Sequence, residues 1–219
     1  MPDDMAPMLQ DMISSLRGKI EQTAERGRQA QKQLTPLMLA SKAGQEDVVR
    51  DLLERGDDVN IETDGGWTAL DKAVSGHHPT IVRLLVQHGA NVSLSSSGFT
   101  ALHSAALLDD VPCAEALLDC GADINIQETN SGQTPLLEAM NEGDGDFRGP
   151  KVARLLIERG ADVTIRDTDG RTVLDYALDY YNCWSAFPDS EWLREDQRDL
   201  IELVRHTAAN QAKAKHPTL

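Results

Sequence analysis

Three side chains in the sequence have the types that acid–base or nucleophilic chemistry uses. Asp71 and His103 each lie three residues after a threonine, in two segments of similar sequence, and Ser104 follows His103 directly. If these segments pack side by side, a carboxylate, an imidazole and a hydroxyl group lie near one another, as in sites that contain a general base and a nucleophile. The hydroxyl group, however, belongs to the next helical position, and no residue pattern marks an oxyanion hole. We therefore interpret the trio as structural and predict that the protein is not an enzyme.

Other motifs for catalysis, cofactors or metals are missing from the sequence. It contains no G-x-S-x-G, P-loop, G-x-G-x-x-G or H-E-x-x-H motif. Cys113, Cys120 and Cys183 form no C-x-x-C pair, which argues against a zinc site and against a disulfide framework. Asp144 and Asp146 lack the spacing of a calcium-binding loop. The sequence therefore predicts neither a cofactor nor a bound metal.

These residues lie within an internal repeat, which must position them in the fold. Each repeat begins with a threonine, followed by leucine two places later and by alanine five places later. The threonines are Thr35, Thr68, Thr100, Thr134 and Thr172, separated by 33, 32, 34 and 38 residues. A threonine side chain can cap a helix by accepting a backbone N–H bond, and a small alanine allows close packing. The motif thus predicts the first helix of each repeat.

A second series follows, in which a leucine pair precedes a glycine. Leucine pairs form the apolar stripe of a second helix, and glycine suits the left-handed conformation that ends it. One such helix pair cannot bury its apolar face alone, so the repeats must stack. We predict burial between repeats for Leu84, Leu85, Leu117, Leu118, Leu155 and Leu156.

The repeated motifs closely resemble those of the ankyrin repeat family. The matching stretches include TPLMLA at 35–40, TALHSAA at 100–106, LLDCGADIN at 117–125 and LLIERGADV at 155–163. The resemblance covers five repeats over residues 34–206. It implies an all-α solenoid of stacked helix pairs joined by short β-hairpin or turn fingers. It also implies a concave face, made of the first helices and the fingers, that binds another protein.

Segments outside the regular repeats are expected to differ from them. Residues 1–33 begin with an apolar stripe at helical spacing, which predicts a helix that caps the first repeat or, alternatively, binds a partner or a second copy. Insertions are expected at about 142–150 and 182–195, the second of them within an atypical C-terminal repeat. Residues 207–219 are polar and are predicted to form a flexible tail.

The charge of the repeat region narrows the class of partner. The chain has a net charge of −15, and residues 34–205 hold 31 acidic and 14 basic residues, a net charge of −17. Such a surface repels nucleic-acid phosphates and attracts basic proteins. The alternative is that the acidity only keeps the protein in solution. No apolar run approaches the 18 or so residues of a transmembrane helix, and no secretory signal is visible, so we expect an intracellular, cytoplasmic protein without a membrane partner.

Large apolar side chains occupy positions that face outward in the ankyrin repeat family. The predicted anchor of a protein partner is Trp67, Phe99, Leu107 and Leu108, joined by Tyr176 and Tyr180. The acidic residues expected to steer a basic partner are Asp64, Asp71, Asp109 and Asp110. Alternatively, Trp67 and Phe99 fold down over neighbouring fingers.

Three functions remain open from the sequence. The leading prediction is a protein-binding adaptor or inhibitor for a basic partner. The first alternative is an acidic, immunity-type neutraliser of a basic toxin or nuclease. The second is an unconventional enzyme with a pocket built from the aromatic C-terminal residues 176–192.

Overall fold

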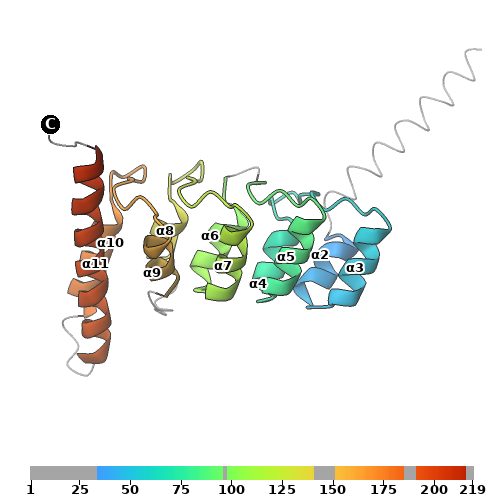
Figure 1. The fold of residues 1–219 in the computed structure, drawn as a ribbon, viewed down its shortest axis with the longest axis horizontal. Coiled ribbons are helices and arrows are strands. Elements are labelled where there is room, and N and C mark those ends of the chain that lie inside the picture. Colours follow the sequence, from blue (N-terminus) through green and yellow to red (C-terminus); the bar gives the residue numbers. More distant parts are fainter. Residues whose placement is uncertain (1–33, 96–97, 141–150, 185–190, 216–219) are drawn as a thin grey trace, which may run out of the picture.

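The computed structural model describes residues 34–95, 98–140, 151–184 and 191–215. Within these ranges the chain forms ten helices and no strand. The helices form five pairs that stack in one row, with α2 and α3 at one end and α11 at the other (Figure 1). The pairs are α2 (Pro36–Lys42) with α3 (Glu46–Glu54), α4 (Ala69–Ser75) with α5 (Pro79–Gln87), α6 (Ala101–Leu107) with α7 (Val111–Asp119), α8 (Pro135–Glu138) with α9 (Lys151–Glu158), and α10 (Val173–Trp184) with α11 (Glu191–Lys215). The predicted all-α repeat stack is confirmed.

The repeated threonines begin the first helices, as the sequence predicts. The Oγ1 atom of Thr35 accepts a hydrogen bond from the Met38 N–H at 3.2 Å, and Thr134 accepts one from Leu137 at 3.2 Å. These bonds satisfy backbone donors that have no partner within the helix. Each threonine therefore fixes where a repeat starts and where the preceding finger must end.

The glycines after the leucine pairs end the second helices. Gly56, Gly89, Gly121 and Gly160 have φ angles of +88°, +90°, +87° and +94°. Residues with a Cβ atom rarely adopt this left-handed conformation, which explains the glycine at this position. The chain then leaves each second helix at the same angle and enters the next finger.

The leucine stripe lies between the helix layers. Leu85, Leu117 and Leu156 are completely buried, while Leu84 and Leu155 are 4% and 9% exposed. Of the six leucines predicted to be buried, only Leu118 is half-buried, where it packs against the edge of the core. The core runs continuously through all five helix pairs, as stacking requires.

Four fingers connect the repeats: the first (residues 57–67), the second (90–99), the third (122–133) and the fourth (161–171). In the described part of these segments the backbone forms turns rather than β-strands, closed by bonds such as Thr63 N–H to Trp67 C=O at 3.0 Å. Asparagine side chains join neighbouring fingers. Asn60 donates to the Gly89 carbonyl at 3.0 Å and accepts from Asn91 N–H at 2.8 Å. Asn125 likewise accepts from Asp162 N–H at 2.8 Å, so the first finger is bonded to the second and the third to the fourth.

The C-terminal helix extends further than the sequence suggests. We expected a flexible tail from residue 207, but α11 continues to Lys215. Its buried residues Leu200, Ile201 and Val204 anchor it, and the alanine-rich end has high helix propensity. Gln211 also bonds to the fourth finger: its Nε2 donates to Ala161 C=O at 2.8 Å, and its Oε1 accepts from Val163 N–H at 3.2 Å. One glutamine thus bonds two backbone groups of the fourth finger.

Replacing Gln211 should loosen this end of the stack. We expect Gln211→Ala to lower the free energy of unfolding by about 1–2 kcal/mol, because two backbone groups of the fourth finger lose their partner. Urea denaturation followed by far-ultraviolet circular dichroism measures the change. Lys213→Ala, at an exposed position on the same helix, is the control. An equal effect of both substitutions would show that the Gln211 bonds do not stabilise the fourth finger.

Several sequence predictions concern residues outside the described ranges. These are the capping helix within 1–33, the insertion at 142–150 and residues 185–190 of the insertion expected at about 182–195, whose other residues belong to α10 and α11. Among the described helices, none has both the length and the apolar character needed to cross a membrane.

Candidate functional site

The predicted acid–base trio does not form a reactive arrangement. The Nε2 atom of His103 lies 3.1 Å from the Gln133 carbonyl, so it carries the hydrogen and donates it. The Nδ1 atom then accepts from the Thr100 N–H at 3.1 Å. Both nitrogens are therefore used, and neither bonds to Asp71. Burial lowers the pKa of His103, which keeps the ring neutral in this role. The hydroxyl of Ser104 is buried without a hydrogen-bond partner.

Asp71 occupies the position of His103 one repeat earlier but is bonded differently. Its Oδ2 atom accepts from both the Thr68 N–H and the Thr68 hydroxyl at 2.7 Å, which completes a capping box at the start of α4. Its Oδ1 atom is buried and has no hydrogen-bond partner. Burial raises the pKa of Asp71 to about 6. This residue caps a helix and is not available to a partner.

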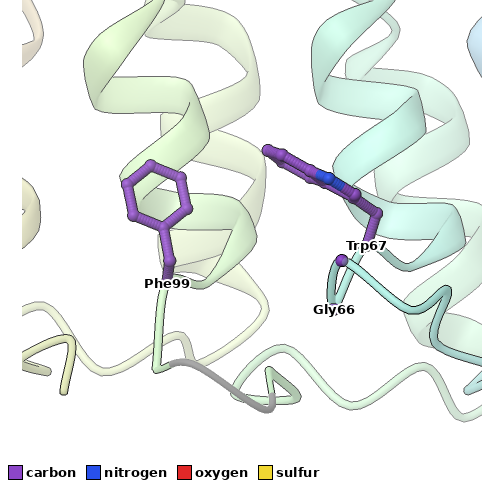
Figure 2. Close-up of a pocket in the computed structure, with 4 residues that line it drawn as sticks. Gly66, Trp67 and Phe99 are labelled. Carbon is purple, nitrogen blue, oxygen red and sulfur yellow. The ribbon is translucent and has the colours of Figure 1, made fainter. Parts of the chain in front are cut away.

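Trp67 and Phe99 form an aromatic pair across two neighbouring fingers. Their ring centroids are 6.4 Å apart with an interplanar angle of 74°, an edge-to-face arrangement. Figure 2 shows the Trp67 ring pointing from the first finger toward Phe99 on the next. Trp67 is 41% exposed and Phe99 is half-buried. The pair therefore keeps aromatic surface in contact with water.

Each ring of the pair is held from within the protein. The Lys72 Nζ atom lies 4.7 Å from the centroid of the Trp67 ring, a cation–π contact. Phe99 stacks on His103 with centroids 5.1 Å apart. Because His103 is itself locked by hydrogen bonds to Thr100 and Gln133, Phe99 rests on a fixed support. The two aromatic side chains are thus positioned before any partner arrives, which reduces the entropy lost on binding.

The other residues of the predicted apolar anchor lie apart from this pair. Leu107 is 42% exposed, whereas Leu108 is half-buried and packs against the core. Phe99 lies just before α6, and Leu107 is the last residue of that helix. The rise along the helix therefore separates the two residues by about 12 Å. Leu39 on α2 is 52% exposed and was missed in the sequence. It occupies the repeat position of Tyr176, so comparing that position between repeats could have found it.

Two of the predicted steering acids bond within the repeat stack. Asp110 is buried, accepts from Cys113 N–H at 3.0 Å as the N-cap of α7, and lies 2.7 Å from the His77 ring. Asp109 accepts from Val152 N–H at 2.9 Å, at the start of α9. Like Asp71, these carboxylates stabilise the fold. Asp64, the remaining member of the set, is exposed on the first finger.

Tyr176 belongs to a bonded group at the C-terminal end. Its hydroxyl donates to Asp167 at 2.7 Å, and the guanidinium of Arg171 lies 3.9 Å from the centroid of its ring. Arg171 also pairs with Asp179. The Tyr180 side chain and the aromatic residues that follow it lie outside the described side chains. In the part of the chain that the structure describes, no group of three or more potential ligands could hold a metal ion.

Comparison with known families identifies the repeats. A model described as ankyrin repeats in three copies matches residues 11–96 and 37–128, and a single ankyrin repeat model matches residues 131–168. Together these matches span more than half of the chain. They include the helices and fingers that hold Trp67 and Phe99.

Individual relatives contain the same repeats within longer proteins. Ankyrin repeat and SOCS box protein 6 of Homo sapiens is 38% identical over 131 residues, which cover 56% of this chain and 30% of that protein. The nuclear factor NF-kappa-B p105 subunit of Gallus gallus is 34% identical over 147 residues, 65% of this chain and 14% of that protein. An ankyrin repeat protein of Fowlpox virus is 31% identical over 192 residues, 85% of this chain and 52% of that protein. The chain thus spans about half or less of these relatives.

Proposed function

Because this chain belongs to the ankyrin repeat family, we propose that it binds a basic protein partner through the exposed side chains of its fingers and first helices. Protein interaction is the role that the repeats support. The proposal adds that this partner is a basic protein. The alternative of an enzyme has no support from the described residues of the aromatic C-terminal region, where Tyr176 is held by Asp167 and Arg171.

The observation that carries the proposal is the edge-to-face pair of Trp67 and Phe99. Exposed aromatic side chains in a pre-positioned group commonly mark interaction sites, since water contact with them is unfavourable. Trp67 remains 41% exposed although it contacts Lys72 and Phe99. The exposed leucines Leu39 and Leu107 provide further apolar contact on the first helices. A partner that covers these side chains removes their apolar surface from water, which makes binding favourable.

Charge favours a basic partner. Residues 34–205, which include the proposed apolar contact site, have a net charge of −17. Complementary charge mainly raises the association rate and selects against acidic partners. Within the predicted set of steering acids, Asp64 is the exposed member, because Asp71 and Asp110 are buried. Added salt should therefore lower the association rate, while the apolar contacts of the bound complex are retained.

The test begins with the partner isolated by pull-down from the native source and identified by mass spectrometry. We expect Trp67→Ala and Phe99→Ala each to weaken its affinity by about 2 kcal/mol or more, because central aromatic side chains dominate such interfaces. Isothermal titration calorimetry measures the affinity, and circular dichroism confirms that each variant is folded.

The control is Val48→Ala, which truncates an exposed apolar side chain on the second helix α3. It should leave the affinity unchanged. Unchanged affinity for both aromatic variants would remove Trp67 and Phe99 from the binding site. An acidic partner would contradict the proposed charge preference.

A further inference from the structure

The first finger lines two hollows, one mainly aromatic and one mainly acidic. One is about 280 Å³ and is lined by Gly65, Gly66, Trp67 and Phe99. The other is about 390 Å³ and is lined by Asp58, Asn60, Ile61, Glu62, Thr63 and Asp64. Asp64 of the second hollow and Gly65 of the first are consecutive in the chain, so both hollows are lined by neighbouring residues of one finger. A single ligand can therefore reach both.

The aromatic hollow has the size for one side chain. Sites for small molecules usually enclose about 300–1,000 Å³, and this open hollow is smaller. Its glycines keep it open: a Cβ atom on Gly65 would lie 3.0 Å from the Trp67 ring, and Gly66 has a φ angle of +73°. An apolar side chain placed there would cover the faces of Trp67 and Phe99 that water now contacts.

The acidic hollow favours a cationic side chain. Asp58 and Asp64 are exposed, and the chain between Arg55 and Lys72 holds no basic residue. No residue of the first finger itself is basic, so no cation of that finger pairs with these carboxylates. Exposed ion pairs contribute little affinity individually, so this hollow selects the ligand and orients it, while the aromatic hollow supplies most of the binding energy.

We propose that the first finger binds an extended peptide segment in which an apolar side chain, seated against Trp67 and Phe99, lies two residues from an arginine or lysine held by Asp58 and Asp64. Successive side chains of an extended strand point to opposite faces, so two side chains that are two residues apart, about 6.6 Å along the strand, can enter two hollows of one finger. This inference rests on the proposed function and adds to it the form of the partner: a short linear segment rather than a broad folded surface.

Selection from a displayed library of random linear peptides tests this inference on the full chain. We expect enriched sequences to place a basic residue two positions from an apolar one. A resynthesised enriched peptide, measured by fluorescence anisotropy, should bind Trp67→Ala at least tenfold more weakly. It should bind the double variant Asp58→Asn/Asp64→Asn at least threefold more weakly and with less dependence on salt.

The matched control is the double variant Asp123→Asn/Asp169→Asn, which removes the same charge from the third and fourth fingers. Asp123 accepts from Asn125 N–H at 2.9 Å, as Asp58 accepts from Asn60 N–H at 2.9 Å, so the turns are equivalent. This variant should bind like the unaltered protein. Equal weakening by the control would show that overall charge acts, rather than the first finger, and would overturn the inference.

The remaining outcomes separate this inference from the proposed function. Absence of enrichment, or enriched peptides that lack a basic residue or bind Trp67→Ala normally, overturns the peptide site. If the native partner nevertheless loses affinity for Trp67→Ala and Phe99→Ala, the proposed function stands and the partner presents a folded surface. If the native partner is also unaffected, both proposals fail.

Discussion

Replacing Leu117 with alanine should lower the free energy of unfolding by about 2–5 kcal/mol, because it removes a fully buried side chain from the middle of the stack. Leu117 belongs to α7, whose helix pair lies third among the five. The cavity would weaken packing on both sides of this pair, since each repeat is stabilised by its neighbours. Domains of this kind are stable by only about 5–15 kcal/mol, so the loss is large.

Urea denaturation of Leu117→Ala against the unaltered protein measures this change. The matched control is Leu118→Ala, the next residue of the same helix, which is half-buried. We expect the control to lose markedly less stability, because less of its side chain leaves water on folding. Equal losses at the two positions would mean that the buried stripe of α7 is assigned to the wrong face.

The repeat pattern allowed the helices and the core to be predicted because their causes are local or periodic. A threonine cap needs only its own next turn, as the Thr35 bond to Met38 shows. The end of a second helix needs only a glycine, as at Gly89 with its positive φ. Burial of Leu85 follows from stacking alone, which the repeat itself implies.

The candidate site was harder to predict because the burial and bonding partners of a side chain depend on the neighbouring repeat. The sequence suggests that Asp110 is a surface acid, but in the structure its carboxylate contacts the ring of His77 from the preceding repeat. Leu107 and Phe99 look like neighbours in sequence, but the length of α6 separates them. Gln211 appears to lie in a polar tail, but it bonds to a finger about fifty residues earlier. Such long-range partners leave no motif in a single sequence.

The bonding of Asp71 also depends on the neighbouring repeat, and it leads us to expect a large effect of pH on stability. In the next repeat, His103 donates a hydrogen bond to the Gln133 carbonyl. An ionised carboxylate in that position has no hydrogen to donate, and the Oδ1 atom of Asp71 is indeed unpartnered. Its burial raises the pKa to about 6, from an ordinary value of 3.8 for this side chain. The folded protein therefore binds a proton more tightly here than the unfolded chain does.

A raised pKa in the folded state fixes the sign of the pH dependence. The contribution of Asp71 to stability is fully present below about pH 4, and it is lost as the pH rises through about 6. We expect the unaltered protein to lose about 2–3 kcal/mol relative to Asp71→Asn between pH 4 and pH 7. Asparagine retains an oxygen that can accept from Thr68 but carries no charge, so the variant removes the titration and keeps the cap. Urea denaturation of both proteins at each pH gives the difference.

Asp175→Asn provides a control of opposite sign in the same structural motif. Asp175 accepts from the N–H and the hydroxyl of Thr172 at 2.7 Å, as Asp71 does from Thr68, but it is exposed. Those hydrogen bonds lower the pKa of Asp175, so its contribution is present near neutral pH and is lost as the pH falls. The unaltered protein should therefore gain stability relative to Asp175→Asn as the pH rises. If both variants shift in the same direction, burial does not control the ionisation of Asp71, and its unpartnered oxygen must be reached by water.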